Sequence, residues 1–128
     1  MKMPYILDVN PDSDALAWER DFLTRIEASV ISCCGPDKDG GCPLLRGENC
    51  GNLQAADGVL FQLNLDRPEH RRILAKYVMQ LDVPIRVTVT PDQEKRWAHL
   101  LELVEVVTPP MGPAKLDAFA AEVESEVD

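Results

Sequence analysis

The sequence predicts a three-layer α/β/α sandwich built on a five-stranded parallel sheet. Short apolar runs alternate with segments of helical periodicity, the order expected when each strand is followed by a crossover helix. The run over 58–65 is apolar on both alternating faces, which is typical of a strand covered by helices on both sides. The 128 residues, of which 45% are hydrophobic and 27% charged, suffice for a single domain over residues 1–128 with its own core.

Each predicted element rests on its own local pattern. Apolar residues at helical spacing predict helices, the first with Trp18 on its inner face, and Ser13, Asp66 and Thr90 are predicted helix caps. Both histidines, His70 and His99, are predicted to be solvent-exposed. The predicted strands cover 4–9, 28–34, 58–65, 84–90 and 104–110, and the predicted helices cover 14–27, 66–81, a segment after Thr90 that carries Trp97, and an acidic segment at 113–127.

The predicted topology is flavodoxin-like, with strand order 2-1-3-4-5. Right-handed crossovers leave few arrangements of five parallel strands, and this order fits best. One helix is absent from the pattern, and a Cys-rich loop over 33–56, with one helical turn at "PLLR", is predicted to replace it. Loops of this length are uncommon in compact domains and usually serve a function.

The element order and two segments, "ADGVLFQLNL" and "VPIRVTVT", carry a resemblance to a known family. Over about residues 5–125 the sequence resembles the receiver domains of bacterial response regulators, in the degenerate pseudo-receiver form of atypical actinobacterial regulators. Receivers accept a phosphoryl group on their own aspartate at the end of the third strand. An acid pair after the first strand holds Mg²⁺, a Thr or Ser ends the fourth strand, and a Lys precedes a Pro after the fifth.

The resemblance implies a degenerate phosphoacceptor pocket in this chain. Asn10 and Pro11 fall at the positions of the acid pair, and Gln62 falls at the position of the phosphoacceptor. An alignment shifted by two residues would use Asp8 instead, and then only one acid remains. Val89 falls at the Thr/Ser position and Thr108 at the Lys position. An amide cannot form an acyl phosphate, and Mg²⁺ prefers carboxylate ligands. We therefore expect a non-enzymatic protein that is independent of phosphorylation and binds no metal or cofactor there.

All four cysteines lie in the stretch "CCGPDKDGGCPLLRGENC", residues 33–50. The favoured interpretation is a thiol switch that senses oxidation, in which Cys33 or Cys34 pairs with Cys42 or Cys50. Such a disulfide closes a short loop and constrains the chain by ~2.5–3 kcal/mol. Two alternatives stay open: the four thiolates hold zinc or an iron–sulfur cluster, or the cysteines pack as small apolar residues.

Charge narrows the class of partner. The net charge of −9 disfavours direct binding to nucleic acid or to anionic lipid, and favours a basic protein partner. The chain starts without a signal-peptide pattern and is expected to be cytoplasmic. The resemblance implies transcriptional control through a protein partner, for which a sigma factor is one candidate, and a homodimer formed through the face of the last two helices.

The runner-up function is a small ligand-binding or enzymatic domain of flavodoxin-like fold. It would use the carboxyl edge of the sheet, where ligands bind in open α/β folds. Asn10, Asp12, Gln62 and Asp66 are expected to converge at that edge. A deep pocket there would favour this function, whereas a flat or filled edge would favour an interaction protein.

Overall fold

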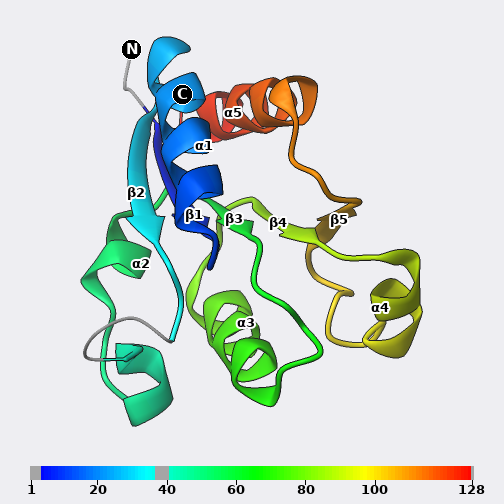
Figure 1. Cartoon of the computed structure of the whole chain (residues 1–128). Coiled ribbons are helices and arrows are strands. Elements are labelled where there is room, and N and C mark those ends of the chain that lie inside the picture. The colour runs from blue at the N-terminus through cyan, green and yellow to red at the C-terminus, as the bar shows by residue number, and fades with distance from the viewer. Residues whose placement is uncertain (1–3, 37–40, 128) are drawn as a thin grey trace.

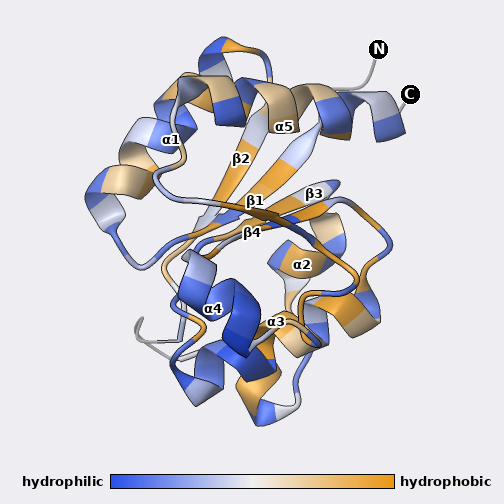
Figure 2. Cartoon of the chain, turned by 90° about the vertical axis from the view of Figure 1, so that its right-hand side faces the viewer, coloured by the Kyte–Doolittle hydropathy of each residue, from blue (hydrophilic) through white to orange (hydrophobic). Residues whose placement is uncertain are grey.

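A computed structural model describes residues 4–36 and 41–127 and shows a parallel five-stranded sheet between two layers of helices (Figures 1 and 2). The strand order is β2-β1-β3-β4-β5, and every neighbouring pair is parallel, which confirms the predicted topology. No helix in the described part of the chain is long and apolar enough to cross a membrane.

The elements follow the predicted order, with strands shorter than the apolar runs suggested. They are β1 (Tyr5–Val9), α1 (Ser13–Arg25), β2 (Ser29–Cys33), the 3₁₀ helix η1 (Pro43–Arg46), α2 (Gly51–Ala55), β3 (Gly58–Phe61), α3 (Pro68–Gln80), β4 (Ile85–Thr88), α4 (Pro91–Arg96), β5 (Glu105–Val107) and α5 (Pro113–Val127).

The structure does not confirm that a loop alone replaces the second helix. The segment between β2 and β3 contains η1 and the one-turn helix α2. Leu44 and Leu53 anchor these short helices, because both side chains are buried in the core beneath the sheet. The helical turn predicted at "PLLR" is η1, whereas α2 was not predicted, because glycine and proline lower helix propensity in this segment. Residues 37–40, also part of the predicted loop, lie outside the described residues.

Two hydrophobic clusters form the core, one on each face of the sheet (Figure 2). Successive residues of a strand point to opposite faces. Leu7 and Val9 of β1 therefore join the cluster formed with η1, α2 and α3, while Ile6 joins the cluster formed with α1 and α5. Asp8 also points to the α1 side, and it is fully buried there.

The helix α1 differs from its predicted pattern in two ways. Its N-cap is Asp12, whose side chain accepts hydrogen bonds from two backbone amides, so Ser13 is not the cap. Trp18 is 43% exposed and stacks on Phe22, whereas Glu19 is buried. The inner face of α1 is thus rotated from the predicted stripe, because a polar residue on that face has a buried partner in the sheet.

The other two predicted caps had different outcomes. Thr90 forms the predicted capping box with Gln93 at the start of α4. Asp66 does not cap α3, because the N-cap is Arg67 and its side chain makes no capping bond. The carboxylate of Asp66 instead accepts a hydrogen bond from Arg96 of α4 at 2.6 Å.

Candidate functional site

A cavity of about 270 Å³ lies at the carboxyl edge of the sheet. Three neighbouring strands, β1, β3 and β4, end at this edge and point their next residues toward it. The helix α1 covers one side, and the segment after β5 covers another. The lining residues are Asn10, Asp12, Ala15, Glu19, Gln62, Thr88, Pro109, Pro110 and Met111.

Gln62 holds two buried carboxyl groups together beside this cavity. Its side-chain nitrogen Nε2 donates to Asp8 Oδ1 at 2.8 Å and to Glu19 Oε1 at 3.0 Å. Its backbone N–H donates to the carbonyl of Val9 at 2.7 Å, which fixes the residue against β1. Asp8 is fully buried and Glu19 is 4% exposed. Both N–H bonds of the amide are therefore engaged by acids from a strand and a helix.

The pair of carboxyls retains a proton near neutral pH. Burial, together with hydrogen bonding to the adjacent Glu19 carboxyl and charge repulsion from it, raises the pKa of Asp8 to about 9. Asp8 Oδ2 is buried and has no hydrogen-bond partner among the residues that the structure describes. A proton between the two carboxyls satisfies this atom, because Asp8 then donates to Glu19. The periodicity of the sequence does not predict this pair, since Glu19 lies one step outside the apolar stripe of its helix.

The structure brings together only part of the predicted phosphoacceptor pocket. Asn10 and Gln62 both line the cavity. Pro11 is exposed and lies outside the lining. Val89 is buried in the core, and its neighbour Thr88 lines the cavity in its place. Thr108 is exposed.

The position where receivers carry a lysine has no basic side chain here. The cavity is bordered instead by Pro109 and Pro110, which directly follow Thr108. The backbone carbonyl of Thr108 accepts a hydrogen bond from Lys115 Nζ. Lys115 also donates to the carbonyl of Pro110 at 3.1 Å. The ammonium of Lys115 is thus bound by backbone oxygens and does not line the cavity.

Asp66, which was expected at the same edge, belongs to a separate polar cluster with α4. Its carboxylate accepts hydrogen bonds from Trp97 Nε1 at 3.3 Å, Gln93 Nε2 at 3.3 Å and Arg96. Hydrogen bonds from Trp97, then Gln93 and Arg96, lower the pKa of Asp66. The guanidinium of Arg71 lies 3.9 Å from the centre of the Trp97 ring. This cluster joins the loop after β3 to α4.

The two histidines differ in their surroundings. His99 is exposed, as predicted, but the prediction of an exposed His70 was wrong. His70 is 2% exposed, and its Nδ1 lies 2.9 Å from the carbonyl oxygen of Asn64. A carbonyl only accepts, so Nδ1 carries the proton. His70 therefore fastens α3 to the loop that follows β3.

Three of the four cysteines converge on the core under α3. Cys33, Cys42 and Cys50 are half-buried and pack against the same hydrophobic cluster, to which Tyr77 belongs. Burial raises the pKa of Tyr77 strongly, and Cys33, Cys50 and Cys42 raise it further, which places all three thiols near its phenol. Cys34 is half-buried without joining this cluster. Over residues 4–36 and 41–127, no group of three or more His, Cys, Asp or Glu side chains is arranged to hold a metal ion.

Two contacts connect the residues around these thiols to the cavity. The backbone carbonyl of Cys33 accepts a hydrogen bond from the N–H of Asn10 at 2.9 Å. The ring of Tyr77 meets the ring of Phe61 edge-on, with centroids 5.7 Å apart, and Phe61 directly precedes Gln62. A change in the position of Cys33 or Tyr77 therefore acts on residues next to the cavity.

No protein-family model matches the sequence, and no curated protein matches it significantly. Solved structures match it over nearly its whole length. A two-component response regulator from Clostridium difficile aligns with a TM-score of 0.71 and 15% identity over 98% of this chain and 99% of that one. The chain has the receiver fold.

Two further solved structures give the same result. A CheY-like response regulator receiver domain protein from Methanospirillum hungatei aligns with a TM-score of 0.67 and 16% identity over 98% of this chain and 99% of that one. The chemotaxis protein CheY4 from Vibrio cholerae aligns with a TM-score of 0.68 and 13% identity over 95% and 99%. At these identities the likeness shows the receiver fold alone, so function is argued from the residues of the site.

Proposed function

We propose that the chain is a response-regulator-like interaction protein that works without phosphorylation and is switched by oxidation of its thiols. The observation that carries this proposal is the position and bonding of Gln62. It occupies the end of β3, where a receiver has its phosphoacceptor, and its amide is fully engaged by Asp8 and Glu19. We propose a protein of the transcription machinery, such as a sigma factor, as the class of partner.

The chemistry of the cavity supports the loss of phosphotransfer. A phosphoryl group needs a nucleophilic oxygen and nearby positive charge to offset its own charge. The amide of Gln62 offers no such nucleophile, and two buried acids lie within 3.0 Å of its nitrogen. An incoming phosphate would meet Glu19 in the lining without a compensating lysine. The same residues give the cavity no role in an enzymatic phosphoryl transfer.

The size of the cavity also favours an interaction protein over the runner-up function. Small-molecule sites in proteins usually have volumes of roughly 300–1,000 Å³ and an apolar lining. The cavity here holds about 270 Å³, and five of its lining residues have polar side chains. It is therefore at the lower limit of what an enzyme or ligand-binding domain of this fold would use.

The thiol arrangement supports the switch. Peroxide oxidises one thiol to a sulfenic acid with release of water, and a second thiol displaces another water to form the disulfide. Overall, two thiols and one peroxide give one disulfide and two waters. Cys33, Cys42 and Cys50 all reach the core near Tyr77, so a disulfide among them would pull on α3 or on the short helices before β3. Cys33 would transmit that pull to Asn10 through its carbonyl.

The test is an intact-mass measurement on reduced protein treated in parallel with peroxide and with acetyl phosphate. We expect a monomer that loses two thiols and two hydrogens under peroxide, and that gains no phosphoryl mass with acetyl phosphate and Mg²⁺. Cys34→Ser is the matched control, because Cys34 lies beside Cys33 but outside the thiol cluster. Four unchanged thiols under peroxide would reject the switch, and a phosphorylated protein would reject the whole proposal.

A further inference from the structure

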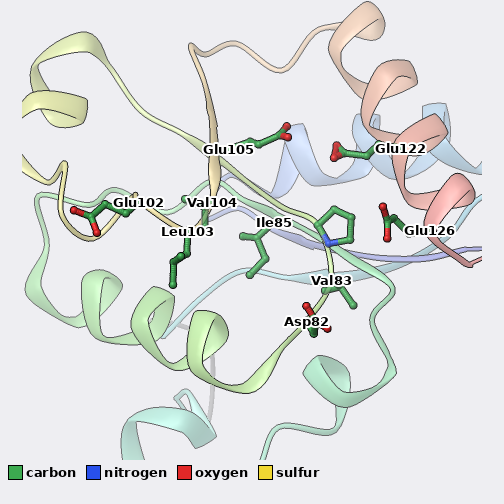
Figure 3. Close-up of a pocket in the computed structure, with 10 residues that line it drawn as sticks. Asp82, Val83, Ile85, Glu102, Leu103, Val104, Glu105, Glu122 and Glu126 are labelled. Atoms are coloured by element: carbon green, nitrogen blue, oxygen red, sulfur yellow. The ribbon is translucent and has the colours of Figure 1, made fainter.

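A second and larger cavity lies at the opposite edge of the sheet, where β4 and β5 begin. It is an open groove of about 420 Å³ (Figure 3). One wall is the chain entering β4, the other is the chain entering β5, and the carboxyl-terminal half of α5 closes one end. The lining residues are Asp82, Val83, Pro84, Ile85, Glu102, Leu103, Val104, Glu105, Glu122 and Glu126.

The groove carries an excess of negative charge. Five of its ten lining residues are acidic, and none is basic. Arg86 reaches it from β4 and pairs with Glu105 at 2.6 Å and with Glu122, whose carboxylates face one another in Figure 3. Within the described part of the chain, Asp82, Glu102 and Glu126 form no ion pair. Three carboxylates of the groove therefore lack a compensating cation.

The same groove exposes apolar surface. Leu103 is 81% exposed, and Val104, Val83 and Pro84 beside it are half-buried. Figure 3 shows Leu103 extending from the chain before β5, with Ile85 beside it. Burying an exposed leucine is favourable by about 1.5–3 kcal/mol, so a partner that covers Leu103 would gain from this contact. The groove thus combines exposed apolar side chains with acidic side chains.

Charge complementarity decides what kind of occupant fits. Nucleic acid and anionic lipid are repelled by carboxylates. A second copy of this chain would bring another net charge of −9 to the same surface. The exposed carboxylate of Glu105 on the edge strand β5 also opposes pairing of two such edges. A positively charged protein segment fits both features of the groove. Its cations would pair with the carboxylates, and an apolar side chain of the segment would cover the exposed apolar residues.

We propose that this groove binds a short basic segment of a partner protein, with an apolar side chain of that segment resting on Leu103 and Val104. The proposal rests on the proposed function and extends it, because it names the docking surface of the interaction protein and the chemical class of the segment that binds there. The surface lies at the amino edge of the sheet, away from the cavity that contains Gln62, so it is available in protein with reduced thiols.

The test uses the intact protein and a short synthetic peptide that combines lysines with leucines. Amide chemical shifts measured during titration should change along the chain entering β4, the chain entering β5 and the end of α5. The leucine contact is tested by Leu103→Ser against Met79→Ser. Both side chains are 81% exposed, so neither change should unfold the protein. We expect Leu103→Ser to weaken binding at least about fivefold and Met79→Ser to change it less than about twofold.

The charge contact is tested in the same titration. Glu102→Gln combined with Glu126→Gln should weaken binding about tenfold and flatten its dependence on salt. Asp92→Asn combined with Glu94→Gln removes the same charge from exposed positions on α4 and should have less than a third of that effect.

Any of four results would overturn the proposal. Shifts that map outside the groove, equal losses in the Leu103 and Met79 variants, or equal binding of a lysine–glycine peptide would each show non-specific attraction to an acidic protein. Calcium alone is included as a probe, and a calcium affinity that exceeds that of the peptide would assign the groove to a cation. All titrations use reduced protein, so the two experiments are independent. If the thiols do not respond to peroxide, the peptide can still bind, and if the peptide does not bind, the oxidation result still stands.

Discussion

The buried proton shared by Asp8 and Glu19 makes folding stability depend on pH in a direction that can be calculated. The pKa of Asp8 is about 9 in the folded protein, against an ordinary value of 3.8. Between these two values the folded state holds one proton that the unfolded state has released. The free energy of unfolding therefore falls as pH rises, by about 1.4 kcal/mol per pH unit from this group. The stabilisation from this proton is fully present below pH 3.8, declines as pH rises, and is lost once pH passes about 9.

The substitution that isolates this effect is Asp8→Asn. The asparagine keeps an oxygen for Gln62 Nε2, and its amide can donate to Glu19 as the protonated acid does. We expect its unfolding free energy, measured by urea titration from pH 5 to pH 8, to have a shallower pH slope than that of the unmodified protein. Over these three units the difference should approach about 4 kcal/mol, a large share of the 5–15 kcal/mol typical of a domain.

A surface substitution provides the control. Asp21→Asn removes an exposed carboxylate from the same helix that carries Glu19, and it should shift stability by less than about 0.5 kcal/mol without changing the pH slope. If Asp8→Asn has the same pH slope as the unmodified protein, the carboxyl of Asp8 is ionised in the folded state. The shared proton would then be refuted, and Gln62 would be holding two charged groups.

The remaining predictions concern stability measured by urea unfolding at constant pH. Gln62→Ala leaves the two buried carboxyls without their shared donor and should cost about 1–3 kcal/mol; a change below about 0.5 kcal/mol would mean that the amide is not holding them. Gly58→Ala should cost about 1–3 kcal/mol, because the new Cβ would lie 2.5 Å from Val123 Cγ2, whereas Gly51→Ala in open space within α2 should be neutral or stabilising. Thr90→Ala removes the capping box of α4 and should cost about 1 kcal/mol; no loss would show that Pro91 alone starts this helix.

The fold was predictable from the sequence because its signals are local and repeated. The buried strands consist of continuous apolar residues, and the crossover rule then leaves one favoured order. The ends of the strands were less predictable. The resemblance places Val89 at the Thr/Ser position of the pocket, and nothing in the run over 84–90 marks Thr88 as the last strand residue. Pairing across the sheet decides it, since Phe61 lies opposite Val87 and the next residues, Gln62 and Thr88, then line the cavity together.

The parts of the site that escaped prediction depend on contacts between distant segments. Glu19 is a polar residue in an amphipathic helix, and its burial makes sense only once Gln62 stands opposite it. His70 was predicted to be exposed because its neighbours are charged, yet the loop after β3 returns over it and supplies a carbonyl. Asp66 had the spacing of a helix cap, but α4 offers it three hydrogen-bond donors. Periodicity detects faces of single elements and cannot detect such pairings.

Cys33, Cys42 and Cys50 pack on the α3 side of the sheet and the cavity lies at its carboxyl edge, and the contact between these two places gives a last prediction. Cys33 points its side chain toward Tyr77 and α3, while its backbone carbonyl holds the N–H of Asn10 at 2.9 Å. A disulfide at Cys33 should therefore shift the amide resonance of Asn10, and the shift should persist in Cys34→Ser and vanish in Cys33→Ser. An Asn10 amide that is unchanged in fully oxidised protein would show that the thiols act only on α3 and the short helices before β3. The cavity would then be a fixed structural feature, and the switch would have to reach a partner from the face that carries the thiols.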